Sequence, residues 1–337
     1  MKIGIVGTGF IADVVARAIA ESESVALVGV ASRRAETARA FAQRHSEPTV
    51  FEHWSDLLAS PGVDAIYVAT PTAVREAICV AAASEGKHVL AEKPFVDLGS
   101  LRTITEACRQ NGVAFMDATH FTHHPRTQLL RRELESRIGR VRSINSCFYF
   151  PNTDRGNIRY NPALEPTGAF GDMAWYAMRA VAEYGAPDVQ LVHAAAAAQR
   201  DAQSGAIIRA AGVLQFDDGS TSTFDAGYDA GSCIMDLALI GTRGMITLDD
   251  FVLDWAGGFA PGIPNYPVGF VQRVGVVAPG GFARVDVHSD TRQVVCMLHD
   301  FADLTREPSG ANAAECIRLS ERTQSLLDAV WQRMVTA

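Results

Sequence analysis

A glycine-rich turn near the N-terminus has the residue types and spacing that suit a phosphate-containing ligand. The segment Gly7–Ala12 reads G-x-G-x-x-A and lies between a short β-branched run and a helical pattern. Gly7 permits a tight turn, Gly9 lets the backbone approach a pyrophosphate, and Ala12 keeps helix and strand close. The helix N-terminus adds N–H groups and the positive end of its dipole. We predict a dinucleotide site here, although an ordinary strand–helix turn is the simpler alternative. The other residues of the predicted site are Thr8, Phe10 and Ile11.

The residues that follow the second apolar run bear on which dinucleotide is bound. Sites that prefer NAD carry an acidic residue here, which binds the ribose 2′-hydroxyl. This chain instead has Ser32, Arg33 and Arg34. Arginine forks suit a phosphate dianion. We therefore predict that these three residues bind the 2′-phosphate of NADP(H). NAD(H) stays open as an alternative, because exposed arginines can also do no more than solvate a loop.

A lysine and a tyrosine have the chemistry for proton transfer to a carbonyl. Hydride transfer to a carbonyl builds negative charge on oxygen, so an acid must deliver a proton there. Tyr176 can donate one, and a lysine cation such as Lys93 would lower its reference pKa of about 10. Asp172 precedes Tyr176 by one helical turn and shares its helix face. We predict that Lys93, Tyr176 and Asp172 are catalytic. Capping by Asp172 and core packing by Tyr176 are the competing interpretations.

The elements that must position these residues begin with alternating strands and helices up to Asp117. Because the strand-like runs are apolar throughout, they indicate a parallel sheet with both faces covered. The predicted strands are Ile3–Val6, Val25–Ala31, Ala65–Ala69, His88–Ala91 and Val113–Met116. The predicted helices are Ala12–Ala20, Ala35–Arg44, Val74–Ala83 and Leu98–Gln110.

After Asp117 the pattern changes to that of a different domain. A helix from Pro125 to about Arg137 precedes an alternating strand, Val141–Phe150, and a helix, Gly168–Tyr184. Strand-like runs with turn signals follow from Gln190 to about Val287, and Ala314–Trp331 predicts a final helix. We expect an α/β Rossmann domain over residues 1–120. Residues 121–337 are expected to form an α+β domain with a large, open, mostly antiparallel sheet. The final helix is a candidate to pack back on the first domain.

Composition narrows the class of protein. The chain has 337 residues, of which 48% are hydrophobic and 20% charged, as in soluble globular proteins. A formal net charge of −8 argues against nucleic acid or an anionic membrane as a partner. The six cysteines include no C-x-x-C pair, so we expect reduced core residues. Neither a signal peptide nor a long apolar span is apparent, so we expect a cytoplasmic location.

Several motifs together resemble the glucose-fructose oxidoreductase/inositol dehydrogenase (Gfo/Idh/MocA) family. Besides the glycine-rich turn, they are Tyr67–Thr72, Ala91-Glu92-Lys93-Pro94, His124-Pro125 with Ile138–Val141, and Gly168–Tyr176. The resemblance covers roughly the first 185 residues, and beyond them only the strand-rich arrangement agrees. Tyr176 stands where inositol dehydrogenase-like members have histidine. The chain therefore resembles the tyrosine-containing subset, which includes dihydrodiol dehydrogenase, xylose dehydrogenase and sugar ketoreductases.

The resemblance implies roles for individual residues. The lysine of the Glu-Lys-Pro motif, here Lys93, is expected to lie by the nicotinamide ribose and the substrate hydroxyl. Two positions depart from the common pattern, since Thr122 replaces an arginine and Arg75 a histidine. We also expect His120 to line the cofactor pocket. The other cofactor contacts implied by the resemblance are Thr70, Pro71, Thr72, Arg75 and Glu92.

The polar loop before the Gly168–Tyr184 helix is the candidate for substrate contacts. Hydroxyl-rich ligands need many donors and acceptors, which Asn152–Arg159 supplies. The predicted substrate contacts are Lys93, Asn157, Arg159, Trp175 and Tyr176. His120, His123 and His124 lack a carboxylate or thiolate partner in sequence, so no metal site is expected.

These observations predict an NADP(H)-dependent oxidoreductase acting on a C–OH or C=O group of a sugar-like, polyhydroxylated substrate. A dehydrogenase of aldoses or dihydrodiols using NAD(P)+ is the first alternative. A non-catalytic NADP-sensing protein that binds a partner is the second. We expect a homodimer or homotetramer formed through the second sheet, since a bare sheet face would expose a large apolar patch.

Overall fold

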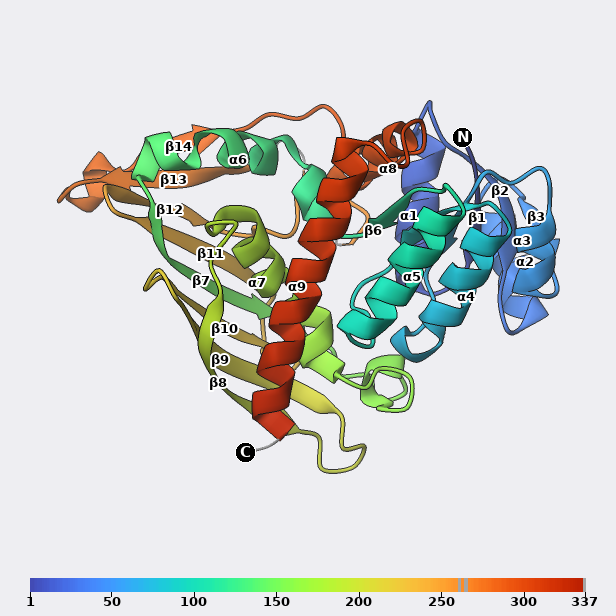
Figure 1. Cartoon of the computed structure of the whole chain (residues 1–337), viewed down its shortest axis with the longest axis horizontal. Helices are drawn as coiled ribbons and strands as arrows, with labels where there is room; N and C mark the ends of the chain where they lie inside the picture. Colours follow the sequence, from blue (N-terminus) through green and yellow to red (C-terminus); the bar gives the residue numbers. More distant parts are fainter. Residues whose placement is uncertain (260–261, 264–265, 336–337) are drawn as a thin grey trace. The chain divides into compact units, whose positions relative to one another are not determined.

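The computed structural model describes residues 1–259, 262–263 and 266–335, which divide into two compact units. The first unit comprises Met1–His123, Trp255–Pro264 and Thr291–Glu321. The second comprises His124–Asp254, Asn265–Asp290 and the chain from Arg322 onward. Each unit is therefore discontinuous in sequence (Figure 1).

The first unit contains a six-stranded parallel sheet in the order β3-β2-β1-β4-β5-β6. This order reverses direction between β1 and β4, and in such sheets ligands bind at that point, beyond the carboxyl ends of the strands. The strands are β1 (Lys2–Val6), β2 (Ala26–Ala31), β3 (Thr49–Phe51), β4 (Ala65–Val68), β5 (His88–Ala91) and β6 (Phe115–Asp117). The helices are α1 (Phe10–Glu21), α2 (Ala35–Arg44), α3 (Trp54–Ala59), α4 (Thr72–Ser84), α5 (Leu98–Gln110), η1 (His120–His123) and α8 (Gln293–Leu304).

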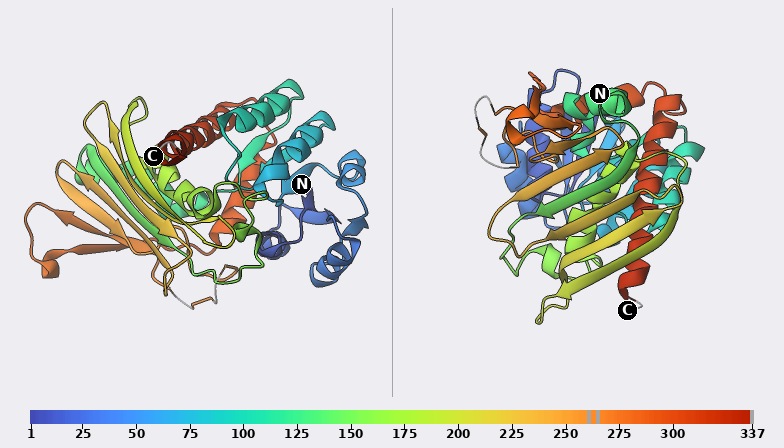
Figure 2. Two further views of the ribbon diagram at one scale, coloured as in Figure 1. Left: turned by 90° about the horizontal axis from the view of Figure 1, so that it is seen from below. Right: turned by 90° about the vertical axis from the view of Figure 1, so that its left-hand side faces the viewer.

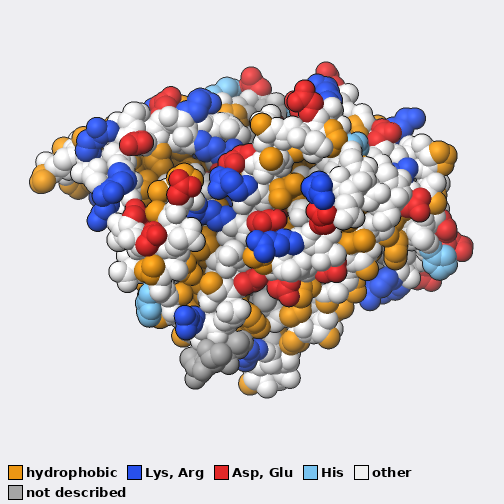
Figure 3. Space-filling model, viewed as in Figure 1, with side chains coloured by type: hydrophobic (Ala, Val, Ile, Leu, Met, Phe, Trp, Pro, Cys, Tyr) orange, Lys and Arg blue, Asp and Glu red, His pale blue; other side chains and the backbone are white. Residues whose placement is uncertain are grey.

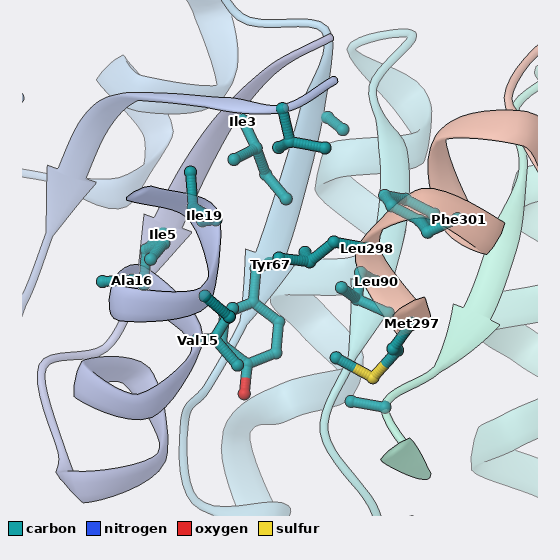
Figure 4. Packing of buried hydrophobic residues seen from close by; sticks show 14 of the residues in the cluster. Ile3, Ile5, Val15, Ala16, Ile19, Tyr67, Leu90, Met297, Leu298 and Phe301 are labelled. Atoms are coloured by element: carbon teal, nitrogen blue, oxygen red, sulfur yellow. The ribbon is translucent and has the colours of Figure 1, made fainter. Parts of the chain in front are cut away.

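The core of this unit explains why its strands are apolar on both faces. All four residues of β4 are buried, and Tyr67 lies among side chains from α1, β5 and α8 (Figure 4). Leu298 and Phe301 of α8 have no measurable exposure. Helix α8 therefore packs in the same core as β1, although nearly 300 residues separate them in sequence.

The second unit contains an eight-stranded sheet in the order β14-β13-β12-β11-β7-β10-β9-β8. Among the described strands of this sheet, only the β7–β10 pair is parallel. The strands are β7 (Val141–Tyr149), β8 (Leu191–Arg200), β9 (Ile207–Phe216), β10 (Thr221–Gly227), β11 (Ile234–Gly241), β12 (Gly244–Leu248), β13 (Gly269–Val274) and β14 (Ala283–Asp286). The helical elements are α6 (Pro125–Ile138), η2 (Ile158–Tyr160), α7 (Gly168–Tyr184) and η3 (Pro279–Gly281). Helix α9 (Ala311–Val335) begins in the first unit and ends in the second.

Helix α7 packs against β7, β9 and β10, and no helix of the described residues covers the opposite face of the sheet (Figure 2). On the open face, β7 and β10 present small and polar side chains such as Asn145, Cys147 and Thr223, which are exposed or half-buried. The homodimer or homotetramer expected through this face stays a prediction.

The predicted fold class is confirmed, and the structure contains further elements. Helices α2, α5 and α7 and strand β5 have the predicted bounds. Strand β3, helix α3 and helix α8 were not predicted. β3 has only three residues and lies at a sheet edge, so it shows little periodicity. No described helix is long and apolar enough to cross a bilayer. On the face shown in Figure 3, acidic and basic side chains are interspersed.

Candidate active site

The glycine-rich turn connects β1 to α1 with the backbone conformation that the motif requires. Gly7 has φ +112°, a region that side chains disfavour. Its N–H donates to the carbonyl of Ala31 at 2.9 Å, which ties the turn to the end of β2. A Cβ placed on Gly7 would lie 2.5 Å from the carbonyl oxygen of Ala69, so glycine is needed for backbone packing.

Gly9 differs from Gly7, because no described atom of the fold excludes a side chain there. A Cβ on Gly9 meets no atom within 4 Å, so the space above the turn is open. Gly9 is the N-cap of α1, whose N-terminus has no side-chain hydrogen bond to cap it. The hydroxyl of Thr70, just beyond β4, is buried and has no hydrogen-bond partner among the described residues. Open space, uncapped N–H groups and an orphaned hydroxyl fit a bound pyrophosphate.

Alanine substitutions at Gly7 and Gly9 should therefore have different consequences. We expect Gly9→Ala to leave thermal stability nearly unchanged while raising the NADPH Kd at least about tenfold, because the methyl group occupies the open space. Gly7→Ala should instead lower the melting temperature, since it forces a positive φ and a backbone clash. Calorimetric titration and thermal unfolding of both variants test this. An unchanged Kd in Gly9→Ala would show that the pyrophosphate does not lie over the turn.

The residues beyond β2 form a small polar cluster with two exposed arginines. The hydroxyl of Ser32 lies 2.9 Å from that of Thr37 and accepts from Thr8 at 3.3 Å. Arg33 and Arg34 are exposed, and neither side chain has a hydrogen bond or ion pair within the described residues. No carboxylate stands at this strand end. The arrangement fits a 2′-phosphate, which two free guanidinium groups would neutralise.

Lys93 lies in a loop whose backbone is held from both sides. Before it, Oε2 of Glu92 accepts from the Lys93 N–H at 3.3 Å, and Oε1 accepts from the hydroxyl of Tyr67 at 2.5 Å. After it, the carbonyl of Pro94 accepts from the guanidinium of Arg75. Burial raises the pKa of the Glu92 carboxyl, while the Lys93 charge and the Tyr67 hydrogen bond oppose that shift. Glu92 thus holds the backbone of the Lys93 loop, and through this contact it can help to position Lys93.

Arg75 and Thr72, two predicted cofactor contacts on the first turn of α4, are buried at 4% and 2% exposure. Any contribution of Arg75 to cofactor binding would pass through the backbone carbonyls it holds. Pro71 is the N-cap of α4, and Phe10 on α1 is 59% exposed beside the glycine-rich turn. Contacts of all four residues with a cofactor stay predictions.

His120, the first residue of η1, is buried shortly after the end of β6. Its Nδ1 lies 2.7 Å from Nε2 of Gln293 on α8, and its ring packs on Phe259 with centroids 4.4 Å apart. Burial, followed by the Lys93 and His123 charges, lowers the pKa of His120 to about 3. His120 is therefore neutral at physiological pH and lies near Lys93. Within the described part of the chain, no cluster of three or more His, Cys, Asp or Glu could hold a metal ion.

In the second unit, Asp172 is the centre of a polar network on α7. Its Oδ2 accepts from Nε of Arg159 at 2.6 Å and from the hydroxyl of Tyr228 at 3.3 Å. The Asp172 charge raises the pKa of Arg159 further, and burial followed by Asp172 raises that of Tyr228. The Arg159–Asp172 ion pair thus joins the predicted substrate loop to helix α7. Tyr228 was not predicted, because a lone tyrosine after β10 carries no motif.

Tyr176 lies one turn beyond Asp172 and is 6% exposed. Its ring packs edge-on against Phe148 of β7, with centroids 5.0 Å apart. Trp175 has no exposed surface, and Oδ1 of Asn157 accepts from the Arg159 N–H at 3.1 Å. The structure therefore joins Arg159 to Asp172 and gives Asn157 a local capping role. Substrate contacts by Asn157, Arg159 and Trp175 stay predictions.

A doubly wound parallel sheet with a glycine-rich turn, followed by an open antiparallel sheet, defines a nucleotide-binding oxidoreductase of two units. The chain belongs to the Gfo/Idh/MocA family. Residues 1–119 match the model of the oxidoreductase family with an NAD-binding Rossmann fold, and residues 128–247 match the GFO/IDH/MocA C-terminal domain. The resemblance predicted from the motifs is thereby confirmed.

Similar proteins include several that act on sugars. D-xylose 1-dehydrogenase (NADP(+)) 2 of Haloferax volcanii is 33% identical over 68% of this chain and 70% of its own. The dTDP-3,4-didehydro-2,6-dideoxy-alpha-D-glucose 3-reductase of Streptomyces antibioticus is 28% identical over 98% of both chains. The 3-ketoreductase KijD10 of Actinomadura kijaniata, solved with NADP and TDP-benzene, superposes with a TM-score of 0.87 at 23% identity. That alignment covers 99% of this chain and 98% of KijD10.

Proposed function

We propose that this protein transfers hydride between NADP(H) and a C–OH or C=O group of a sugar or sugar-derived substrate. The observation that carries the proposal is the end of β2, where the exposed side chains of Arg33 and Arg34 have no hydrogen bond or ion pair within the described residues and the sequence has no carboxylate. This combination suits a 2′-phosphate and lacks the acid that would bind a 2′-hydroxyl. The Haloferax relative, a xylose dehydrogenase named for NADP(+), and KijD10, which was solved with NADP, support the choice.

The residues that would bind the cofactor belong to the first unit. The α1 N-terminus and Gly9 would receive the pyrophosphate, and Ser32, Arg33 and Arg34 the 2′-phosphate. The bound nicotinamide would supply the hydride-transfer chemistry. The buried hydroxyl of Thr70, at the carboxyl end of β4, offers one more donor at the edge where such sheets bind ligands.

Proton transfer is assigned to Lys93 and Tyr176. Lys93 belongs to the first unit and Tyr176 to the second. In reduction, the Tyr176 hydroxyl would donate its proton to the developing alkoxide, and the Lys93 cation would favour the resulting phenolate. Asp172 is held by Arg159 and Tyr228 and shares a helix face with Tyr176, so it would hold the substrate or Lys93 in place. The sugar relatives support a polyhydroxylated substrate.

The cofactor proposal is tested by titrating the protein separately with NADPH and NADH. We expect NADPH to bind more tightly, and Arg33→Ala/Arg34→Ala to raise its Kd roughly 10- to 100-fold, since charge-assisted hydrogen bonds are lost. The NADH Kd should change little. Arg39→Ala, an exposed arginine on the neighbouring helix α2, is the matched control. Equal affinities for both nucleotides would leave NAD(H) as a working cofactor, and no binding of either would contradict the proposal.

A further inference from the structure

Arg75 occupies a position that is unfavourable for a guanidinium group. It lies on the first turn of α4, where the helix dipole disfavours positive charge. Its side chain is 4% exposed, and its Nε has no hydrogen-bond partner among the described residues. A buried, incompletely paired charge weakens stability unless its other contacts compensate. Its location therefore calls for an explanation other than stability.

The two remaining nitrogens of Arg75 hold two neighbouring loops. Nη2 donates to the carbonyl of Thr70 at 2.6 Å, and Nη1 donates to the carbonyl of Pro94. Thr70 follows β4 and Pro94 follows β5, and these two strands are adjacent and parallel. The planar fork thus bridges the two loops at the edge of the sheet where ligands bind.

One of these loops carries Lys93, immediately before Pro94. Glu92 holds the lysine backbone on its N-terminal side, and Arg75 holds it on its C-terminal side. Fixing the backbone on both sides limits where the Lys93 ammonium group can lie. Small displacements of a reacting group can lower a rate about a hundredfold, so such bracing has kinetic consequences.

We infer that Arg75 is a positioning residue, which braces the Lys93 loop against the Thr70 loop and thereby places Lys93 for proton transfer. The inference rests on the proposed function for the role of Lys93. If Arg75 instead bound the cofactor directly, its replacement would raise the NADPH Kd. A lysine at this position could not replace the fork, because one ammonium group cannot match the planar, two-pronged geometry.

The first arm of the test measures steady-state kinetics and NADPH binding of Arg75→Met and Arg75→Lys. We expect kcat to fall about 10- to 100-fold in Arg75→Met, with the NADPH Kd and the substrate KM changing less than about threefold. Arg75→Lys should restore little of the lost kcat. Arg126→Met is the matched control, since Arg126 is also buried, donates to the Phe251 carbonyl at 2.8 Å and has an unpaired Nε.

The second arm does not depend on turnover. The chain has only three lysines, Lys2, Lys87 and Lys93, so an amine-reactive reagent followed by mass spectrometry reports each one separately. We expect Lys93 to react at least about threefold faster in Arg75→Met and Arg75→Lys, relative to Lys2 in the same sample. If the wild type reduces no sugar, the proposed function fails while this arm still tests the bracing.

Three results would overturn the inference. The first is an unchanged kcat together with an unchanged Lys93 labelling rate. The second is a raised NADPH Kd with full kcat at saturation, which would make Arg75 a cofactor ligand. The third is full recovery of kcat in Arg75→Lys, which would mean that a point charge suffices and that the fork is not required.

Discussion

Lys93→Met is expected to lower kcat about a thousandfold while leaving the NADPH Kd within severalfold of the wild type. General acid–base assistance contributes about 10²- to 10⁴-fold to such reactions, and the lysine cation is assigned to that step. Stopped-flow measurement of NADPH oxidation under single-turnover conditions would isolate the chemical step from binding and product release. A ketosugar panel supplies the substrates, because the proposal specifies the chemical class and not one compound.

Lys87→Met is the matched control for this variant. Lys87 is a buried lysine of the first unit, and its ammonium group donates to the carbonyls of Ser60 and Val63 at 2.9 and 2.8 Å. We expect Lys87→Met to lower thermal stability and to retain kcat, because these contacts are structural. Loss of kcat to the same extent in both variants would mean that Lys93 also acts through folding alone.

Tyr176→Phe is expected to lower kcat about 10²- to 10³-fold, because phenylalanine keeps the packing on Phe148 and removes only the proton donor. Cofactor affinity should not change, since Tyr176 is not among the residues assigned to cofactor binding. The measurement is the pH dependence of kcat with the variant and the wild type. The variant should lose the limb that reports the ionisation of the proton donor.

Tyr184→Phe provides the control on the same helix. Tyr184 is also buried, burial raises the pKa of its hydroxyl to about 12, and no part in proton transfer is assigned to it. We expect Tyr184→Phe to keep kcat and its pH profile. If Tyr176→Phe retains full turnover of a confirmed substrate, proton donation must be assigned elsewhere. If neither variant nor the wild type turns over any sugar while NADPH binds tightly, a sensing role gains support.

Much of the first unit was predictable because its signals are local. The apolar runs that predicted the parallel sheet lie within the first 117 residues, and the glycine-rich turn directly follows the first of them. Gly7 is an example, because the tight turn after β1 requires a positive φ at this residue, and glycine adopts it most readily. Motif order across the chain likewise indicated the family, which the family models confirmed.

Other features depend on residues that are far apart in sequence. Tyr228 contacts Asp172 across 56 positions, and Gln293 contacts His120 across 173. No local pattern marks either pairing, because each arises only when separate elements pack together. Helix α8 is a similar case, since its apolar side chains fill a core formed by α1, β4 and β5.

The sequence by itself determined the fold class, the glycine-rich turn, the pair of arginines after β2 and the family, because each is encoded by residue type and short spacing. Tertiary structure decided the hydrogen-bonding roles of Arg75, Glu92 and Asp172. Arginine is a residue type that often binds anions. The sequence does not reveal that the guanidinium group of Arg75 already donates to the carbonyls of Thr70 and Pro94. Burial and partner geometry, which exist only in the folded chain, determine what each charged group can do.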